Sequence, residues 1–237
     1  VPGQISHTWN AATDDTGSVA GYVIRRNGVQ LGTSSGTLYI DTGLAPSTTY
    51  AYSVAAFDAT GNTSAYSSDV VATTPALPSG LVAAYSMNQS SGSTLPDVSG
   101  RGNTGHLVNG PSWVAGKYGN ALSFNGSNQR VDVGDAASLD LTTGMTLAAW
   151  VRPATVSSFW RDVIMKGADE YYLAGSSPSG GAPAAGGTFT SPLYGPALVA
   201  NTWSHLAATY DGATFRLFIN GVQVASRSQS GAIRSAS

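Results

Sequence analysis

The segment Asp97-Val-Ser-Gly-Arg-Gly-Asn-Thr-Gly105, followed by Gly119-Asn-Ala-Leu-Ser-Phe-Asn-Gly126, says more about the fold of this chain than any other part of its sequence. The first segment places three glycines, one carboxylate and one amide within nine residues, a composition that favours tight turns. The second segment predicts a short strand, Ala121–Phe124, that enters another turn. Short strands between tight turns are typical of all-β proteins.

The composition of the whole chain also indicates an all-β fold. Its 237 residues include 29 glycines, whereas Glu170 is the one glutamate and lysine occurs only at Lys117 and Lys166. Helix-forming charged residues are therefore nearly missing, and no long stretch shows helical periodicity. Cysteine is absent, which excludes a disulfide framework and thiolate metal sites.

Charge and hydropathy exclude two classes of partner. Charged residues make up 10% of the chain and the formal net charge is −2, so no basic surface is available for nucleic acid. No apolar run is long enough to cross a bilayer. We therefore expect neither nucleic-acid binding nor membrane insertion.

A proline-containing segment divides the chain into two predicted domains. Thr73–Ser79 holds two prolines, which stiffen a linker and cannot donate ladder hydrogen bonds. We expect a first domain at residues 1–75, a linker at 76–79 and a second domain at 80–237.

Alternating apolar and polar residues predict strands throughout the first domain. Asn27-Gly28 favours positive φ at both positions, so it predicts a type I′ hairpin. The expected strands lie around Ile5, His7 and Trp9, and over Gly21–Arg26, Val29–Leu31 and Ala51–Phe57.

These residues resemble a fibronectin type III domain. In that resemblance Trp9 is the core tryptophan of the second strand, Tyr22 the aromatic residue of the third, and Leu44 with Tyr50 the tyrosine corner. Almost nothing precedes Gln4, so the first strand of the family is expected to be short or missing. Without an Arg-Gly-Asp tripeptide, a rigid spacer is the favoured interpretation and ligand adhesion the alternative.

The second domain is expected to contain buried strands and a C-terminal meander. Asp211-Gly212 and Asn220-Gly221 stand at tight-turn spacing between apolar runs. The predicted strands are Leu81–Met87, Val131–Val133, Met145–Val151, Trp203–Tyr210, Thr214–Ile219 and Val222–Ala225.

Several motifs of this domain resemble a laminin-G-like jelly roll of the concanavalin A-like lectin/glucanase superfamily. They are Gly80-Leu-Val-Ala-Ala-Tyr-Ser86, the glycine loop at 97–105, the segment Gly119–Gly126, Thr146-Leu-Ala-Ala-Trp-Val151, and Trp203-Ser-His-Leu-Ala-Ala-Thr-Tyr210 with Leu217-Phe-Ile-Asn-Gly-Val222. The resemblance implies an antiparallel β-sandwich in a secreted or cell-surface bacterial protein. Further strands of the family pattern are expected beyond Ser237, so a continuation, a neighbouring domain or another subunit would complete the sandwich.

The same resemblance implies a structural calcium ion at the glycine loop. Asp97 offers a carboxylate, Asn103 an amide oxygen, and glycines such as Gly100 let backbone carbonyls turn inward, as oxygen-ligated calcium requires. The alternative is a plain turn in which Asp97 and Asn103 bond only neighbouring backbone amides.

Glycoside hydrolysis is not expected within these residues. Such chemistry generally needs two carboxylates that flank one bond, and the glucanase pattern places two glutamates along one strand. A chain with one glutamate does not carry that pattern, and in a strand the adjacent Asp169 and Glu170 would point to opposite faces. No catalytic residue is assigned.

Exposed aromatic residues are the candidates for glycan binding. Sugar-binding modules stack rings on sugars and fix hydroxyl groups with a few polar side chains. The candidates are Trp160, Tyr171, Tyr172 and Tyr194, beside a Gly/Pro/Ser-rich segment, Gly175–Pro192, that is expected to form a flexible rim loop. Trp150 and Trp203 lie in strongly apolar runs and are interpreted as core.

The sequence as a whole predicts an all-β chain, with a small fibronectin type III-like sandwich and a larger antiparallel jelly roll. The expected function is non-catalytic carbohydrate binding that targets a polysaccharide-active enzyme to its substrate. The alternative is an adhesive or structural surface protein that binds other proteins, for example by strand addition.

Overall fold

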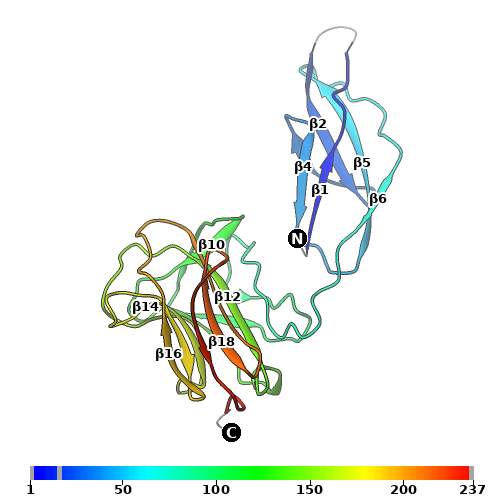
Figure 1. Cartoon of the computed structure of the whole chain (residues 1–237). Coiled ribbons are helices and arrows are strands. Elements are labelled where there is room, and N and C mark those ends of the chain that lie inside the picture. Colours follow the sequence, from blue (N-terminus) through cyan, green and yellow to red (C-terminus); the bar gives the residue numbers. More distant parts are fainter. Residues whose placement is uncertain (1–2, 15–17, 235–237) are drawn as a thin grey trace. The chain divides into compact units, whose positions relative to one another are not determined.

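The structure is a computed structural model that describes residues 3–14 and 18–234. The chain divides into two compact units, residues 1–88 with 96–102, and residues 89–95 with 103–237 (Figure 1). Both are built from antiparallel strands, and the described residues contain no α-helix, only a 3₁₀ turn at Ala137–Leu139. The predicted all-β class is confirmed. The predicted linker at 76–79 lies within the first unit, and the predicted domain boundaries stay a prediction.

The first unit is a sandwich of two sheets. One sheet pairs β1 (Gln4–Thr8) with β4 (Leu38–Thr42), and the other has the order β3-β2-β5-β6. Ile5, Ile24, Leu44 and Tyr52 pack between the sheets as the core. The strands of the larger sheet are β2 (Val19–Arg26), β3 (Val29–Ser34), β5 (Thr49–Asp58) and β6 (Val70–Thr73).

The predicted hairpin of the first unit is confirmed. Asn27 and Gly28 have φ angles of 50° and 79°, and Arg26 pairs with Val29 across them. Positive φ at both central residues is the signature of a type I′ turn, whose twist suits the flanking strands. Nearby, the hydroxyl of Tyr50 accepts a 3.0 Å hydrogen bond from the Ala45 amide, which ties the start of β5 to the preceding corner.

A buried carboxylate links the two sheets of the first unit. Asp41 on β4 accepts hydrogen bonds from Arg26 Nη1 at 2.9 Å and from the Tyr52 hydroxyl at 2.6 Å. The His7 ring lies 3.9 Å from the Tyr52 ring, centroid to centroid. Buried charge is stable only when it is paired and hydrogen-bonded. These contacts therefore fix β4 of one sheet against β2 and β5 of the other.

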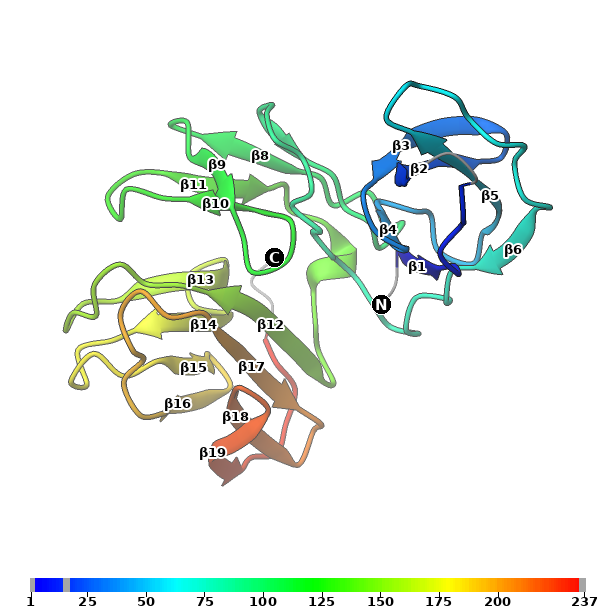
Figure 2. The same cartoon turned by 90° about the horizontal axis from the view of Figure 1, so that it is seen from above.

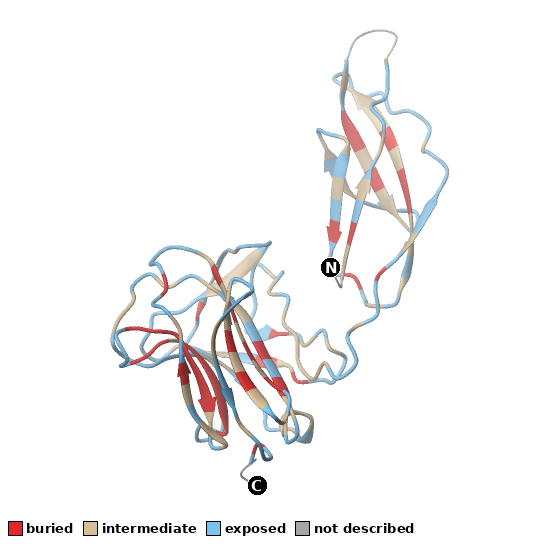
Figure 3. Cartoon of the chain, viewed as in Figure 1, coloured by how far each residue is buried: buried red, intermediate tan, exposed pale blue. Residues whose placement is uncertain are grey.

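The second unit has a core between two four-stranded sheets (Figure 2). One sheet has the order β12-β17-β18-β19 and the other β13-β14-β15-β16. Figure 3 shows the buried residues concentrated on the facing strands. Leu147, Leu173, Leu206, Phe215 and Leu217 lie at the centre of this core. The strand bounds are β12 Met145–Val151, β13 Arg161–Lys166, β14 Tyr171–Ser176, β15 Ala184–Gly187, β16 Thr190–Tyr194, β17 Ser204–Tyr210, β18 Thr214–Ile219 and β19 Val222–Ser228.

The C-terminal meander matches its prediction. Consecutive strands β17, β18 and β19 pair antiparallel, and Ile219 pairs with Val222 across Asn220-Gly221. Asn220 and Gly221 have φ angles of 52° and 81°, as a two-residue hairpin turn requires.

Two small sheets complete the second unit. One has the order β11-β8-β7 and the other pairs β9 with β10. The predicted strand at Ala121–Phe124 is present, one residue earlier, as β10. The bounds are β7 Thr94–Leu95, β8 Gly105–Val108, β9 Ser112–Ala115, β10 Asn120–Ser123 and β11 Arg130–Val133.

The predicted strand at Leu81–Met87 is wrong. Its backbone bonds to the turn at 97–99 instead of entering a ladder: the Ala84 amide donates to Asp97 Oδ1 at 2.9 Å, and its carbonyl accepts from the Val98 amide at 2.8 Å. Met87 has a φ of 52°, which no strand allows. The segment is apolar, as a buried strand would be, but no strand of the described residues pairs with it.

The predicted rim loop at Gly175–Pro192 is also wrong, because it contains β15 and most of β16. Ala184 and Ala185 are completely buried, so packing on both faces of the sheet overrides the weak strand propensity of small residues. Pro192 is tolerated because β16 is the edge strand.

Candidate glycan-binding site

Alternation along β14 sorts its side chains onto two surfaces. Tyr171 and Leu173 enter the core, whereas Tyr172 and Ala174 pack with Ala184 in a separate cluster on the opposite face. Successive residues of a strand point to opposite sides of the sheet, so this second cluster lies on the outer face of sheet β13–β16.

The register of the sheet brings further residues to this outer face. Asp162 on β13 pairs with Ala174, and Tyr194 on β16 pairs with Ala184. The ladder shifts register on both sides of Asp162, a local irregularity that re-aims side chains. Tyr172 pairs with Gly186, and a Cβ added there would lie 2.6 Å from the Tyr172 hydroxyl. The phenol therefore occupies the space that glycine leaves open.

Trp160, directly before β13, adds a second ring to this surface. Its ring lies 5.6 Å from that of Tyr172 with the planes inclined by 81°, and the residue stays 42% exposed. The two rings and the carboxylates of Asp162 and Asp169 line a pocket of about 260 Å³. Asp169 reaches it from the β13–β14 turn, where its φ is 65°. We call these four residues the outer-face pocket.

The electrostatics of the outer-face pocket are those of an acidic, partly desolvated site. Desolvation, and secondly the charge of Asp169, raise the pKa of Asp162. Desolvation also raises the pKa of Tyr172 to about 12, with Tyr194 and the two carboxylates adding to the shift. The pocket thus presents hydrogen-bond acceptors and negative charge between aromatic rings.

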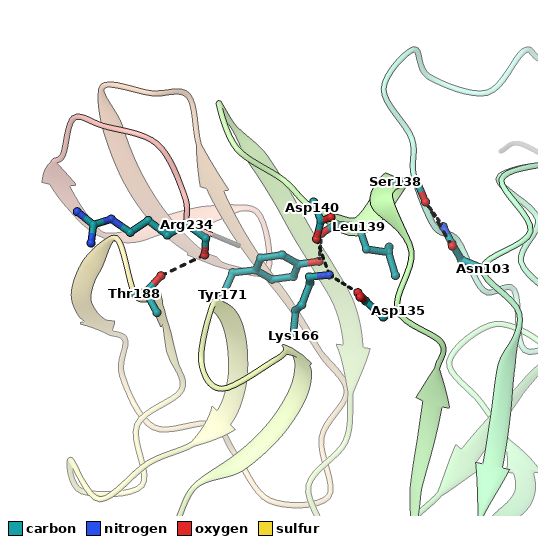
Figure 4. Close-up of polar contacts among 9 residues, drawn as sticks. All are labelled: Asn103, Asp135, Ser138, Leu139, Asp140, Lys166, Tyr171, Thr188 and Arg234. Carbon is teal, nitrogen blue, oxygen red and sulfur yellow. Dashed lines mark hydrogen bonds and ion pairs between the residues drawn. The ribbon is translucent and has the colours of Figure 1, made fainter. Parts of the chain in front are cut away.

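The structure brings Trp160, Tyr172 and Tyr194 to one face but corrects the assignment of Tyr171 as a ligand-binding residue. Tyr171 is 5% exposed in the core, and its hydroxyl donates a 2.9 Å hydrogen bond to the Leu139 carbonyl (Figure 4). Adjacent residues of one strand do not serve one surface.

Asp162 and Asp169 are site residues that the sequence analysis did not assign as such. Asp162 had a signal, because its spacing of two from Trp160 is the same-face spacing of a strand. That signal becomes visible only once β13 is recognised. Asp169 had no such sequence signal, because its position in the pocket depends on the conformation of the β13–β14 turn.

The core assignment of Trp150 is wrong as well. Trp150 is 40% exposed on β12, and its ring lies 5.8 Å from that of the exposed Tyr118. Lys117 Nζ is 5.3 Å from the Trp150 ring and the His205 ring packs beside it. β12 alternates, with Met145 and Leu147 buried and Trp150 turned outward. Trp203, directly before β17, is half-buried.

The predicted calcium ligands take part in local hydrogen bonds. Oδ1 of Asp97 accepts from the amides of Ala84 and Ser99, and Oδ2 accepts from the Ser99 hydroxyl at 2.7 Å. Asn103 is buried and its amide donates to Ser138 Oγ at 2.9 Å (Figure 4). Asp97 and Gly100, with a φ of 80°, belong to the first unit and Asn103 to the second. Over residues 3–14 and 18–234, no three His, Cys, Asp or Glu side chains group as metal ligands.

Calcium needs six to eight oxygen ligands, so one carboxylate and one amide fall short of its shell. The residues present therefore do not by themselves fit the ion. No helix within residues 3–14 and 18–234 is long and apolar enough to cross a membrane.

Comparison with curated proteins finds partial matches to enzymes that act on polysaccharides. The chain is 55% identical over 69 residues to an alpha-amylase of Niallia circulans, 51% over 72 residues to exoglucanase B of Cellulomonas fimi, and 51% over 70 residues to chitinase Chi52 of Paenibacillus xylanexedens. These matches cover 29%, 30% and 30% of this chain but only 5%, 6% and 13% of the enzymes. The chain thus spans a small part of its curated relatives.

Two solved structures are similar at a lower level. Domain 4 of AbnA, a GH43 extracellular arabinanase from Geobacillus stearothermophilus in complex with arabinotriose, has a TM-score of 0.46 and 18% identity, covering 58% of this chain and 71% of that one. An S-layer domain-containing protein from Clostridium thermocellum has a TM-score of 0.39 and 23% identity, covering 62% and 73%. These scores are too low to support an inference.

The family comparison concerns the second unit. Residues 125–237 match the concanavalin A-like lectin/glucanases superfamily, and they hold both four-stranded sheets and the outer-face pocket. Residues 125–237 therefore form a concanavalin A-like domain of the lectin/glucanase type.

Proposed function

We propose that this chain is a non-catalytic accessory region of a secreted polysaccharide-active protein, and that its concanavalin A-like domain binds a glycan at the outer-face pocket. The observation that carries the proposal is the pocket itself, with Trp160 and Tyr172 as walls and Asp162 and Asp169 as polar groups. Ligand sites are typically concave, with aromatic walls and a few polar groups that fix orientation.

The chemistry of the pocket suits a sugar. The C–H face of a pyranose packs on an aromatic ring, and its hydroxyl groups donate hydrogen bonds to carboxylates. A pocket of about 260 Å³ is near the lower end of ligand sites, roughly 300 Å³, so it suits one sugar unit of a longer chain. Tyr194, on the same face and 41% exposed, offers a further ring to a neighbouring unit.

The curated relatives support an accessory role. An amylase, an exoglucanase and a chitinase differ in activity, yet each matches this chain over a stretch of 69 to 72 residues. A stretch of that length is close to the predicted first domain of 75 residues. We propose that this domain is a fibronectin type III spacer, in keeping with its two sheets, its Trp9–Tyr22 packing and its Tyr50 corner. Tethering a binding module to an enzyme raises the local concentration of substrate.

Binding by the 237-residue chain tests the proposal. Affinity electrophoresis in gels that contain soluble starch, β-glucan, glycol chitin or arabinan, with calorimetry on oligosaccharides, would show retardation by at least one glycan. Trp160→Ala should abolish the retardation. Phe124→Ala, which removes a similarly exposed ring elsewhere in the second unit, should not. Uniform failure to bind would reject the proposal and favour an adhesive protein that contacts other proteins.

A structural calcium ion at the glycine loop is a second, separate proposal, which the resemblance implies and to which Asp97 would offer a carboxylate and Gly100, at positive φ, a backbone carbonyl. It requires further oxygen ligands from water or from chain beyond these residues. Calcium titration monitored by thermal unfolding, with Asp97→Asn as the matched variant, tests it. A melting temperature that calcium leaves unchanged in the parent chain rejects the ion.

A further inference from the structure

The outer-face pocket carries negative charge that no basic side chain balances. Over residues 3–14 and 18–234, neither Asp162 nor Asp169 forms an ion pair. The two basic residues of β13 are engaged elsewhere: Lys166 pairs with Asp135 and Asp140 at 2.7 Å each (Figure 4), and Arg161 donates to the Gly126 carbonyl at 3.0 Å. Among the described residues, therefore, no ion pair neutralises either carboxylate of the pocket.

The two carboxylates disfavour each other in the free protein. Desolvation and the charge of Asp169 both raise the pKa of Asp162, so keeping both groups ionised has a free-energy cost. A bound cation would offset the repulsion between the two carboxylates, whereas a bound anion would add to it. The pocket thus favours a cationic ligand over an anionic one.

The aromatic walls of the pocket also favour a positively charged ligand. Ring faces carry negative quadrupole density and attract cations within about 6 Å, most strongly for tryptophan. Trp160 and Tyr172, with planes inclined by 81°, present two such rings beside the carboxylates. A neutral hydroxyl or acetamido group would gain hydrogen bonds only, and a uronic acid would be repelled.

Resting on the proposed function, we propose that the outer-face pocket selects a cationic sugar: it binds the protonated amine of an unacetylated 2-amino sugar within a polysaccharide. Asp162 and Asp169 would accept hydrogen bonds from the ammonium group, and Trp160 and Tyr172 would enclose it. The pocket would then discriminate against the acetylated, neutral and anionic counterparts of the same chain.

The preference for a cationic sugar can be measured with β-1,4-linked hexamers that differ only in the group at carbon 2. The 237-residue chain would be titrated calorimetrically at about pH 6 and low salt with hexamers of glucosamine, N-acetylglucosamine and glucose. We expect the glucosamine hexamer to bind about tenfold more tightly than the glucose hexamer, the combined effect of one cation–π contact and one partly screened ion pair. Asp162→Asn or Asp169→Asn should each reduce that preference at least about threefold.

Matched controls separate the pocket from general charge attraction. Asp69→Asn removes one exposed carboxylate from the first unit and should leave the preference unchanged. Hexalysine carries positive charge without a sugar ring and should bind at least about tenfold more weakly than the glucosamine hexamer.

The outcomes distinguish the two proposals. Equal or weaker binding of the glucosamine hexamer, with Trp160-dependent binding of a neutral hexamer, overturns the cationic preference and leaves the glycan site intact. If none of the sugar hexamers binds, both the cationic preference and the glycan site are overturned. Equal binding of hexalysine overturns the assignment to an amino sugar.

Discussion

The ring of Trp160 meets the ring of Tyr172 edge to face, with centroids 5.6 Å apart. Tyr172 is itself fixed, because it is 7% exposed and its phenol lies over Gly186 on the next strand. The more exposed tryptophan therefore rests against a ring that the sheet holds in place. Such preorganisation lowers the entropy lost when a ligand binds.

Gly186→Ala should damage the outer-face pocket without unfolding the domain. A Cβ at this position would lie 2.6 Å from the Tyr172 hydroxyl and 2.8 Å from the carbon that bears it, so the ring must move. Overpacking of this kind costs about 1–3 kcal/mol of folding free energy. Glycan affinity should fall severalfold while the circular dichroism spectrum stays unchanged, and unaltered affinity would show that the ring position does not matter.

Adjacent tyrosines on β14 should respond oppositely to substitution. Tyr171→Phe removes the hydrogen bond to the Leu139 carbonyl and should cost about 1 kcal/mol, with glycan affinity unchanged. Tyr172→Leu removes a pocket wall and should reduce affinity about fivefold or more, since one aromatic contact is worth roughly 1 kcal/mol or more. Urea unfolding and calorimetry on both variants provide the measurements. Loss of binding in Tyr171→Phe would contradict the assignment of the two faces.

Asp162→Asn should stabilise the chain at neutral pH. The raised pKa means that the folded state holds this proton where the unfolded chain, with a pKa of about 3.9, has lost it. Stability therefore falls as pH rises through this window, and the amide abolishes that fall. The advantage of the variant should shrink toward zero below about pH 4 in thermal unfolding curves. A less stable variant at neutral pH would indicate a structural role for the carboxylate.

The first unit should lose stability in mild acid through His7. Burial lowers the pKa of His7, with Asp41 opposing the shift, so between that value and 6.5 the unfolded chain binds more protons than the folded one. Stability contributed by neutral His7 is thus present above pH 6.5 and is lost as pH falls through the window. Hydrogen exchange of the β2 and β5 amides at about pH 7 and about pH 5 would measure it. His7→Gln should flatten this dependence, and an identical pH response in the variant would exclude His7 as its source.

Local chemistry accounts for the elements that the sequence predicts well. Met145–Val151 matches β12 in both bounds, and Asn220-Gly221 closes the hairpin it predicts, because turn residues and apolar runs carry their own geometry. Gly175–Pro192 fails because burial, which depends on distant strands, makes a strand of residues that locally favour loops. Leu81–Met87 fails for the converse reason: it is apolar but has no strand partner among the described residues.

The candidate site was predictable only in part. Ring chemistry singles out Trp160, Tyr172 and Tyr194, but the inward direction of Tyr171 depends on the register of β14, which follows from its neighbours. Asp162 and Asp169 line the same pocket because of the shape of the turn before β14, and no local sequence motif predicts that shape.

The alternation of β14 has a consequence for how such domains diversify. Leu173 and Tyr171 face the core, while Tyr172 and Ala174 face outward on the same strand. Natural selection can therefore change the outward pair to suit a new ligand while the inward pair continues to maintain the fold. Substitutions on one face are uncoupled from the other, so a single scaffold can be adapted to different ligands.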